Sequence, residues 1–141
     1  MSFDSRVVLD TSTLIGALLK PHSPPAQALI CAREFFAVIV SSETLGELKR
    51  VLDRDRLDRY RSPEERATFF REYSLMAIEV DVTESVTACR DPNDDKFLPL
   101  AVSGGAAIIV SSDQDLLTMG QYRGVPILTA RAFIELCDTQ V

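Results

Sequence analysis

The stretch RVVLDTSTLIGALL, residues 6–19, decides the fold of this chain. Its short apolar run at 7–9 is typical of a strand that is buried on both faces, as in a parallel sheet. The triplet Thr11-Ser12-Thr13 offers a helix cap, and leucines then recur at helical spacing. Asp10 therefore stands where a strand ends and a helix begins, at the edge where open α/β sheets bind their ligands.

Alternating strand and helix patterns continue along the chain. We expect further strands at 36–40, 77–82, 106–110 and 125–128, with helices in the intervals that include 25–35, 42–53, 63–76 and 131–137. No repeat or linker interrupts them. This alternation predicts one α/β domain over residues 1–141, with a central parallel sheet of about five strands and helices on both faces.

Length and composition are those of an ordinary soluble protein. The chain has 141 residues, of which 46% are hydrophobic and 26% charged. It contains no apolar run of the roughly 20 residues that span a bilayer, and no secretory signal at its start. Cys31, Cys89 and Cys137 are far apart and form no CxxC pair, which indicates reduced thiols. We therefore expect a cytoplasmic protein that does not contact a membrane.

A second aspartate follows a strand in the same way as Asp10. The run 106–110 leads through Ser111 and Ser112 into Asp113, and neighbouring parallel strands would bring both carboxylates to one edge. Asp94 and Asp95 begin the intervening helix, either as simple caps or as part of the same site, and the edge at which they lie is left open. Clustered carboxylates favour a hard cation such as Mg²⁺ or Mn²⁺, which activates water for phosphodiester cleavage.

Other kinds of catalytic site are not evident. The chain has no glycine-rich phosphate loop, no nucleophile elbow and no HExxH motif, and its one histidine, His22, falls in a proline-rich turn. The net charge of −6 is the wrong sign for a nucleic-acid binder. Basic residues are nevertheless concentrated at 49–61, either as a solvated helix face with local ion pairs or as a phosphate-binding face formed by Lys49, Arg50 and Arg54.

These motifs, in this order, resemble the PIN domain, the nuclease fold of VapC-type toxins. The resemblance covers about residues 6–136, and its motif positions correspond to Asp10 with Ser12, Glu47, Asp95 ahead of Leu98 and Ala101, and Ser111 with Asp113. The segment DPNDDKFL at 91–98 is similar to a subgroup described as the toxin component of toxin–antitoxin modules. Ser12 and Ser111 replace the commoner asparagine and threonine but keep a polar group.

The resemblance implies a metal-dependent endoribonuclease that acts as a toxin. Its catalytic and metal-binding residues would be Asp10, Glu47, Asp95 and Asp113, with Mg²⁺ or Mn²⁺ as the cofactor. Ser12 and Ser111 would orient these ligands, and Asp115 would either assist or cap the following helix. The implied partners are an RNA substrate and an antitoxin protein, and a homodimer is left open.

Three alternatives stay open at this point. On a helical wheel, Glu47 lies away from the leucine face and is predicted to face solvent, and Glu43, one turn earlier, is the alternative ligand. The chain could be a catalytically silent PIN-like module that binds RNA or protein. An aspartate-based phosphatase would need a second aspartate two residues after Asp10, where Ser12 stands.

Overall fold

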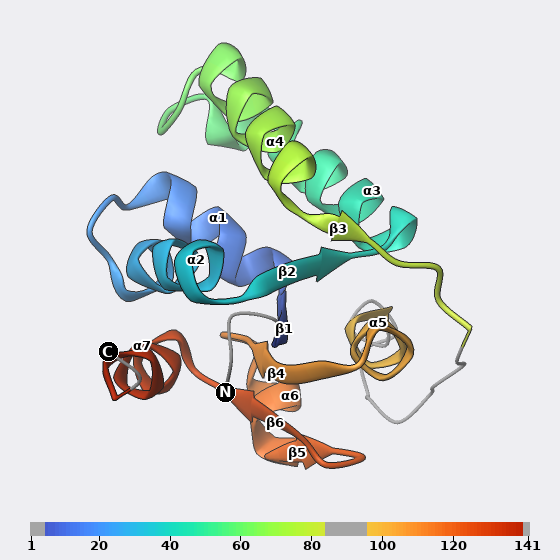
Figure 1. The fold of residues 1–141 in the computed structure, drawn as a ribbon. Coiled ribbons are helices and arrows are strands. Elements are labelled where there is room, and N and C mark those ends of the chain that lie inside the picture. The colour runs from blue at the N-terminus through green and yellow to red at the C-terminus, as the bar shows by residue number, and fades with distance from the viewer. Residues whose placement is uncertain (1–4, 84–95, 140–141) are drawn as a thin grey trace.

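The apolar runs pair into one sheet in the computed structural model, which describes residues 5–83 and 96–139 (Figure 1). In these residues the strand order is β3-β2-β1-β4-β6-β5. The strands are β1 (Arg6–Leu9), β2 (Ala37–Val40), β3 (Ile78–Glu79), β4 (Ala106–Val110), β5 (Gln121–Tyr122) and β6 (Val125–Leu128). All neighbouring pairs are parallel except β5 with β6. The prediction of an α/β fold with a mainly parallel sheet is confirmed.

Two details of the sheet differ from the prediction. The expected strand at 77–82 shortens to β3, whose two residues are exposed at the sheet edge. The hairpin strand β5 was not predicted, because it has only two residues and no apolar run. Arg123 and Gly124 both have positive φ, 49° and 83°, which suits the tight turn between β5 and β6.

Alternate residues of the central strands face opposite layers. Val7 and Leu9 of β1 belong to a core with α1 (Thr11–Leu19), α2 (Pro24–Phe35) and α7 (Ala130–Asp138). Val8 belongs to a second core with α5 (Phe97–Gly104) and α6 (Gln114–Met119). Figure 1 accordingly shows α2 and α7 on one side of the sheet and α5 on the other. Burial on both faces explains why these strands are continuous apolar runs.

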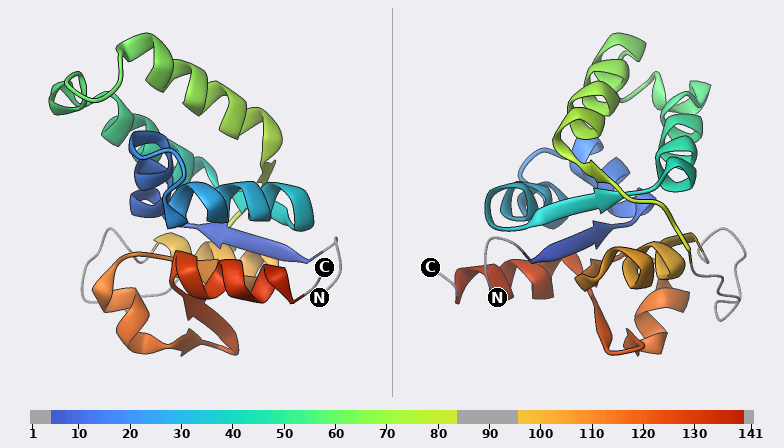
Figure 2. Two further views of the ribbon diagram at one scale, coloured as in Figure 1. Left: turned by 90° about the vertical axis from the view of Figure 1, so that its left-hand side faces the viewer. Right: turned by 45° about the vertical axis from the view of Figure 1, so that its right-hand side comes forward.

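Helices α3 (Ser42–Leu52) and α4 (Pro63–Met76) pack against each other as a pair (Figure 2). Ser41 and Ser62 cap them, each with a capping box. The short 3₁₀ turn η1 (Asp55–Leu57) lies in the connection between the two helices. This connection carries most of the basic run noted in the sequence.

Helix α5 tolerates a proline because of where it begins. Pro99 is its third residue, so its missing amide is one of the first four that have no intrahelical partner. Gly105 follows the helix in the left-handed conformation, with φ of 66°, which a glycine adopts readily at a helix end. The capping role considered for Asp94 and Asp95 lies outside the described residues.

The described cysteines are free thiols. Cys31 is half-buried and Cys137 is buried, and Cys89 lies outside the described residues. Burial, followed by the charge of Cys31, raises the pKa of Cys137 to about 12, so this thiol is poorly reactive. Over the described part of the chain, none of the helices has the length and apolar character needed to cross a membrane.

Candidate metal-dependent nuclease site

The two strands that end in aspartate are neighbours in the sheet. β1 pairs with β4 in parallel, with Leu9 opposite Val110, so Asp10 and Asp113 follow the carboxyl ends of adjacent strands. β2 and β3 continue the sheet on one side of β1, and β4 and β6 continue it on the other. The β1–β4 junction is therefore the topological switch point, where ligands of open α/β sheets bind. The prediction that both aspartates share one edge is confirmed.

Asp10 is buried and held by three donors. Its exposed fraction is only 2%. Its Oδ1 accepts from the amide of Thr13 at 2.9 Å and from the hydroxyl of Ser12 at 3.1 Å, and its Oδ2 accepts from Ser111 at 2.5 Å. The hydrogen bond from the Thr13 amide makes Asp10 itself the N-cap of α1. The expectation that the hydroxyl triplet supplies the cap is therefore wrong. This carboxylate has one fixed orientation, which a ligand site needs.

Ser111 joins the two aspartates. Its hydroxyl donates to Asp10, and it also accepts from the amide of Asp113 at 2.9 Å. Asp113 Oδ1 caps α6 by accepting from the amide of Leu116 at 3.1 Å. Asp115 lies inside the first turn of α6, so the alternative in which Asp115 supplies that cap is wrong. The Ser112 hydroxyl, which the sequence did not single out, lies 2.6 Å from that of Ser12.

Glu47 faces the site and not open solvent. The hydroxyl of Thr11 donates to its Oε2, and the ammonium of Lys96 lies 3.1 Å from its Oε1. The side chains of Lys96 and Glu47 are only 13% and 16% exposed. The helical-wheel expectation of a solvated Glu47 is therefore wrong. A helical wheel identifies the apolar face of α3 but does not show which residues lie against its polar face. Glu43, the alternative, is exposed.

A pocket of about 380 Å³ connects these residues. Phe97, the first residue of α5, lines it together with Asp10, so the start of α5 lies at the carboxyl edge of the sheet. The alternative in which this helix begins at the opposite edge is wrong, since a helix that connects parallel strands runs back across the sheet. The remaining lining residues are Thr11, Ser12, Ile15, Glu47, Val51, Arg54, Arg56 and Asp113.

The three predicted RNA-binding residues lie in different surroundings. Arg54 lines the pocket, and so does Arg56, which the sequence did not single out. Lys49 is paired with Asp53 at 3.3 Å and lies 5.7 Å from the ring centroid of Phe70 on α4, so it is directed toward α4. Arg50 is exposed and is not among the pocket residues.

The donor set suits a hard cation. Asp10, Glu47 and Asp113 offer carboxylate oxygens, the ligand type that Mg²⁺ and Mn²⁺ prefer. Within residues 5–83 and 96–139, no three acidic, histidine or cysteine side chains are grouped as a metal site. Asp95, the fourth predicted ligand, lies outside the described residues.

Comparison with known proteins gives the family. A sequence model described as "PIN domain" matches residues 6–115, which include Asp10, Glu47 and Asp113. The chain belongs to the PIN-domain family. PIN domains are generally nucleases, and the family generally depends on a divalent metal. The sequence-based assignment is confirmed.

Individual relatives of this PIN domain are distant. The uncharacterized protein MJ1680 of Methanocaldococcus jannaschii is 28% identical over 116 residues, which cover 81% of this chain and 74% of that protein. PAE2754 from Pyrobaculum aerophilum has a similar structure, with a TM-score of 0.64 and 16% identity, covering 96% of this chain and 91% of that one. A chain of VapBC2 from Rickettsia felis, in a crystal structure bound to a DNA fragment from their promoter, has a TM-score of 0.62 and 12% identity. That match covers 88% of this chain and 98% of the other. The two structures show the same fold.

Besides Ser112, sequence reasoning missed three polar residues of this PIN-domain site. Thr11 was considered only as a cap, Arg56 only as part of a basic run, and Lys96 not at all. A signal for Lys96 was present, because it stands inside the DPNDDKFL segment that carries the family resemblance. Its contact with Glu47 could not be foreseen, since 49 positions separate the two residues.

Proposed function

We propose that this PIN domain is an Mg²⁺- or Mn²⁺-dependent endoribonuclease that hydrolyses RNA phosphodiester bonds. The observation that carries the proposal is the buried Asp10 carboxylate, which three donors orient toward a pocket also lined by Glu47 and Asp113. An aspartate with 2% exposure costs free energy unless it is fully hydrogen-bonded. A buried, fully hydrogen-bonded carboxylate at the switch point of the sheet supports a chemical role for Asp10.

Each acidic residue has a distinct part in the proposed reaction. Asp10, Asp113 and Glu47 would hold the cation, together with Asp95 as the fourth ligand. When bound, the cation supplies an activated water and stabilises charge on the phosphate. Ser111 fixes the Asp10 carboxylate relative to Asp113, and Ser12 supports Asp10 from the other side. These hydroxyls keep the carboxylates aimed into the pocket, as partners of metal ligands commonly do.

The proposal includes an antitoxin partner. The fold shared with a VapBC2 chain supports a role as the toxin of a toxin–antitoxin pair. Such a partner would inhibit the nuclease by covering the pocket. Co-expression with the product of the neighbouring gene, followed by size-exclusion chromatography, tests for a stable complex and for loss of cleavage in that complex.

The direct test of the activity is RNA cleavage by purified protein with Mg²⁺, Mn²⁺ or EDTA. We expect EDTA to abolish cleavage and Asp10→Asn to reduce it by orders of magnitude. Cleavage that proceeds equally fast in EDTA would refute the metal-dependent mechanism. If Asp10→Asn folds, binds RNA and cuts at the parental rate, the assignment of the site would be wrong.

Two matched pairs of variants test the assignment of the remaining ligands. Glu47→Gln should strongly reduce cleavage, whereas Glu43→Gln, one turn away and exposed, should have little effect. Asp95→Asn should reduce cleavage more than Asp94→Asn. A reversal within either pair would show that the neighbouring carboxylate is the ligand. A protein that binds RNA but never cleaves it would support the silent-module alternative.

A further inference from the structure

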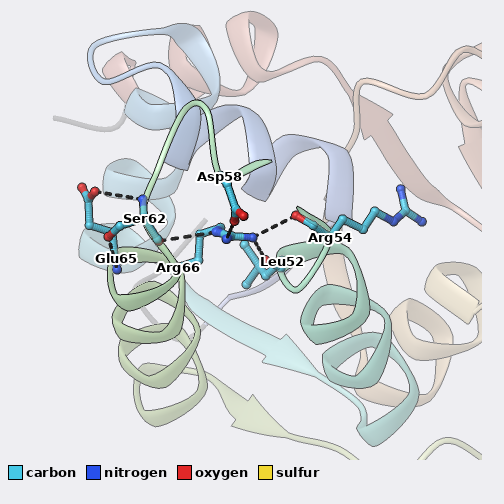
Figure 3. A network of polar contacts seen from close by, with 6 residues as sticks. All are labelled: Leu52, Arg54, Asp58, Ser62, Glu65 and Arg66. Carbon is cyan, nitrogen blue, oxygen red and sulfur yellow. Dashed lines mark hydrogen bonds and ion pairs between the residues drawn. The ribbon is translucent and has the colours of Figure 1, made fainter. Parts of the chain in front are cut away.

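The connection between α3 and α4 is built around one buried arginine. Arg66 of α4 is 4% exposed and crosses to the end of α3 (Figure 3). Its Nη1 donates to the carbonyl of Leu52 at 2.6 Å and to that of Arg54 at 3.0 Å, and its Nη2 pairs with Asp58. Its Nε also donates to the carbonyl of Ser62 at 3.4 Å. Four contacts from one guanidinium therefore determine the backbone path between the two helices.

This arrangement leaves two other arginines directed elsewhere. The Arg54 carbonyl faces Arg66, while its guanidinium extends away from this network (Figure 3). Arg54 and Arg56 line the same pocket as Asp10, Glu47 and Asp113. Two of the three carboxylates at 53–58 are already engaged, because Asp58 pairs with Arg66 and Asp53 with Lys49. Among the described residues, neither Arg54 nor Arg56 has a side-chain hydrogen bond or ion pair with another residue.

We propose that Arg54 and Arg56 form a phosphate subsite for an unpaired RNA strand, and that Arg66 is the positioning residue that holds it. The proposal rests on the proposed function, since it adds a backbone contact to the strand cleaved at the acidic side of the pocket. Guanidinium groups bind phosphate through paired, charged hydrogen bonds. A pocket of about 380 Å³ is at the small end for ligand sites, which suits one nucleotide of a single strand.

The subsite also offsets the negative charge that would repel an RNA phosphate from this pocket. The chain carries a net charge of −6, and three carboxylates line the pocket, so a phosphate approaching without a cation is repelled. Two arginines that line the same pocket provide the local attraction that the overall charge lacks. The apolar side chains of Ile15, Val51 and Phe97 also line the pocket, and they offer no hydrogen bond that would distinguish one base from another. The hydroxyls of Thr11 and Ser12 already donate to Glu47 and Asp10. We therefore expect recognition of the strand's backbone without strong sequence preference.

Binding is measured separately from cleavage. A fluorescein-labelled unpaired oligoribonucleotide is titrated by anisotropy in Mg²⁺ buffer, in an Asp10→Asn background that leaves the strand intact. Arg54→Gln and Arg56→Gln should each weaken binding by roughly tenfold, as expected for one charged hydrogen bond. Each should also reduce the salt dependence of log K by about 0.7, the value for one phosphate on a single strand. Arg131→Gln removes the same charge from an exposed position on α7 and should change binding by less than twofold.

The role of Arg66 is tested through its exposed partner, because Arg66 variants could fail to fold. Asp58 is 54% exposed, and Asp58→Asn removes its ion pair with Arg66 while keeping the chain's surface polar. Simple electrostatics predicts tighter RNA binding when a negative charge is lost. The positioning role predicts the opposite, a loss of about threefold with an unchanged rate of cleavage at saturating RNA. Asp53→Asn, the matched control beside Lys49, should leave binding unchanged or slightly tighter.

The outcomes separate this proposal from the proposed function. If Arg54→Gln and Arg56→Gln bind RNA as well as Arg131→Gln does, the subsite is refuted, whatever the nuclease assay shows. If Asp58→Asn and Asp53→Asn behave alike, the positioning role of Arg66 is refuted. A protein that binds through both arginines but cleaves nothing would support the subsite and refute the nuclease. Equal affinity for a duplex of the same sequence would refute the preference for an unpaired strand.

Discussion

Replacing Lys96 with methionine tests how the acidic site is balanced. Methionine keeps most of the apolar stem but removes the ammonium that lies 3.1 Å from Glu47 Oε1. Removing one partner of a fully buried ion pair costs about 3–5 kcal/mol, whereas exposed pairs contribute about 0–1 kcal/mol. At 13% and 16% exposure, and with Thr11 still donating to Glu47, we expect a loss of about 2 kcal/mol without metal. At roughly 3 °C per kcal/mol, the Tm should fall by about 6 °C.

The same substitution should improve metal binding. In the parent, both oxygens of Glu47 are occupied by protein donors, so a cation that uses this carboxylate must displace Lys96. If displacement costs about 2 kcal/mol, Lys96→Met should bind Mg²⁺ roughly 30-fold more tightly. Mg²⁺ at 100 times its Kd would then add about 2.7 kcal/mol of stability to the variant and restore its Tm.

Thermal melts over a Mg²⁺ titration, with calorimetry for the Kd, measure both effects. Lys49→Met is the matched control, because its partner Asp53 is exposed and the pair does not line the pocket. We expect this control to lower the Tm without metal by no more than about 3 °C. It should leave the Mg²⁺ midpoint unchanged. If Lys96→Met binds Mg²⁺ no more tightly than the parent, Glu47 is not a ligand that Lys96 blocks, and the reasoning fails.

Three further predictions concern single side chains. Asp10→Asn should lower the unfolding free energy by less than about 1 kcal/mol, because an asparagine still caps α1 and can donate to Ser111. Asp10→Ala should cost about 3 kcal/mol. Equal losses for the two variants in urea denaturation would point to a site that tolerates no polar replacement. Tyr73→Phe should gain about 1 kcal/mol, because the buried hydroxyl has no hydrogen-bond partner among the described residues. Burial, with a smaller effect of Asp10, raises the pKa of Tyr73 above its usual 10. The unfolding free energy of the parent should therefore fall above pH 10 more steeply than that of Tyr73→Phe. Parallel profiles of unfolding free energy against pH would contradict this. Hydrogen bonds from Ser62 lower the pKa of Glu65 below its usual 4.5. The ionised Glu65 therefore stabilises the fold above pH 4.5, and this stabilisation is lost as the pH falls through the pKa of the folded state. The difference in unfolding free energy between the parent and Glu65→Gln should accordingly shrink in acid.

Much of this fold follows from local sequence. Caps act over three residues, so Ser41 and Ser62 determined where α3 and α4 begin, with only their own neighbours involved. The runs at 7–9 and 106–110 are apolar at every position, which requires strands that are covered on both faces. Placing Asp10 and Asp113 directly after these two runs was enough to predict a shared acidic edge once the strands were taken as neighbours.

Other features depend on contacts that only the tertiary structure creates. Glu47 meets Thr11 across 36 positions and Lys96 across 49. The reason is that β1 lies centrally in the sheet and that α3 and α5, the helices after β2 and β3, both begin at its carboxyl edge. Helical periodicity could identify the leucine face of α3 but not what stands opposite its polar face. The buried Arg66 likewise appears in the sequence as one more charged residue of a helix. Its role depends on its closeness in space to backbone carbonyls at the end of α3. Because every residue has a backbone carbonyl, the residue types at those positions do not reveal which carbonyls will accept from Arg66.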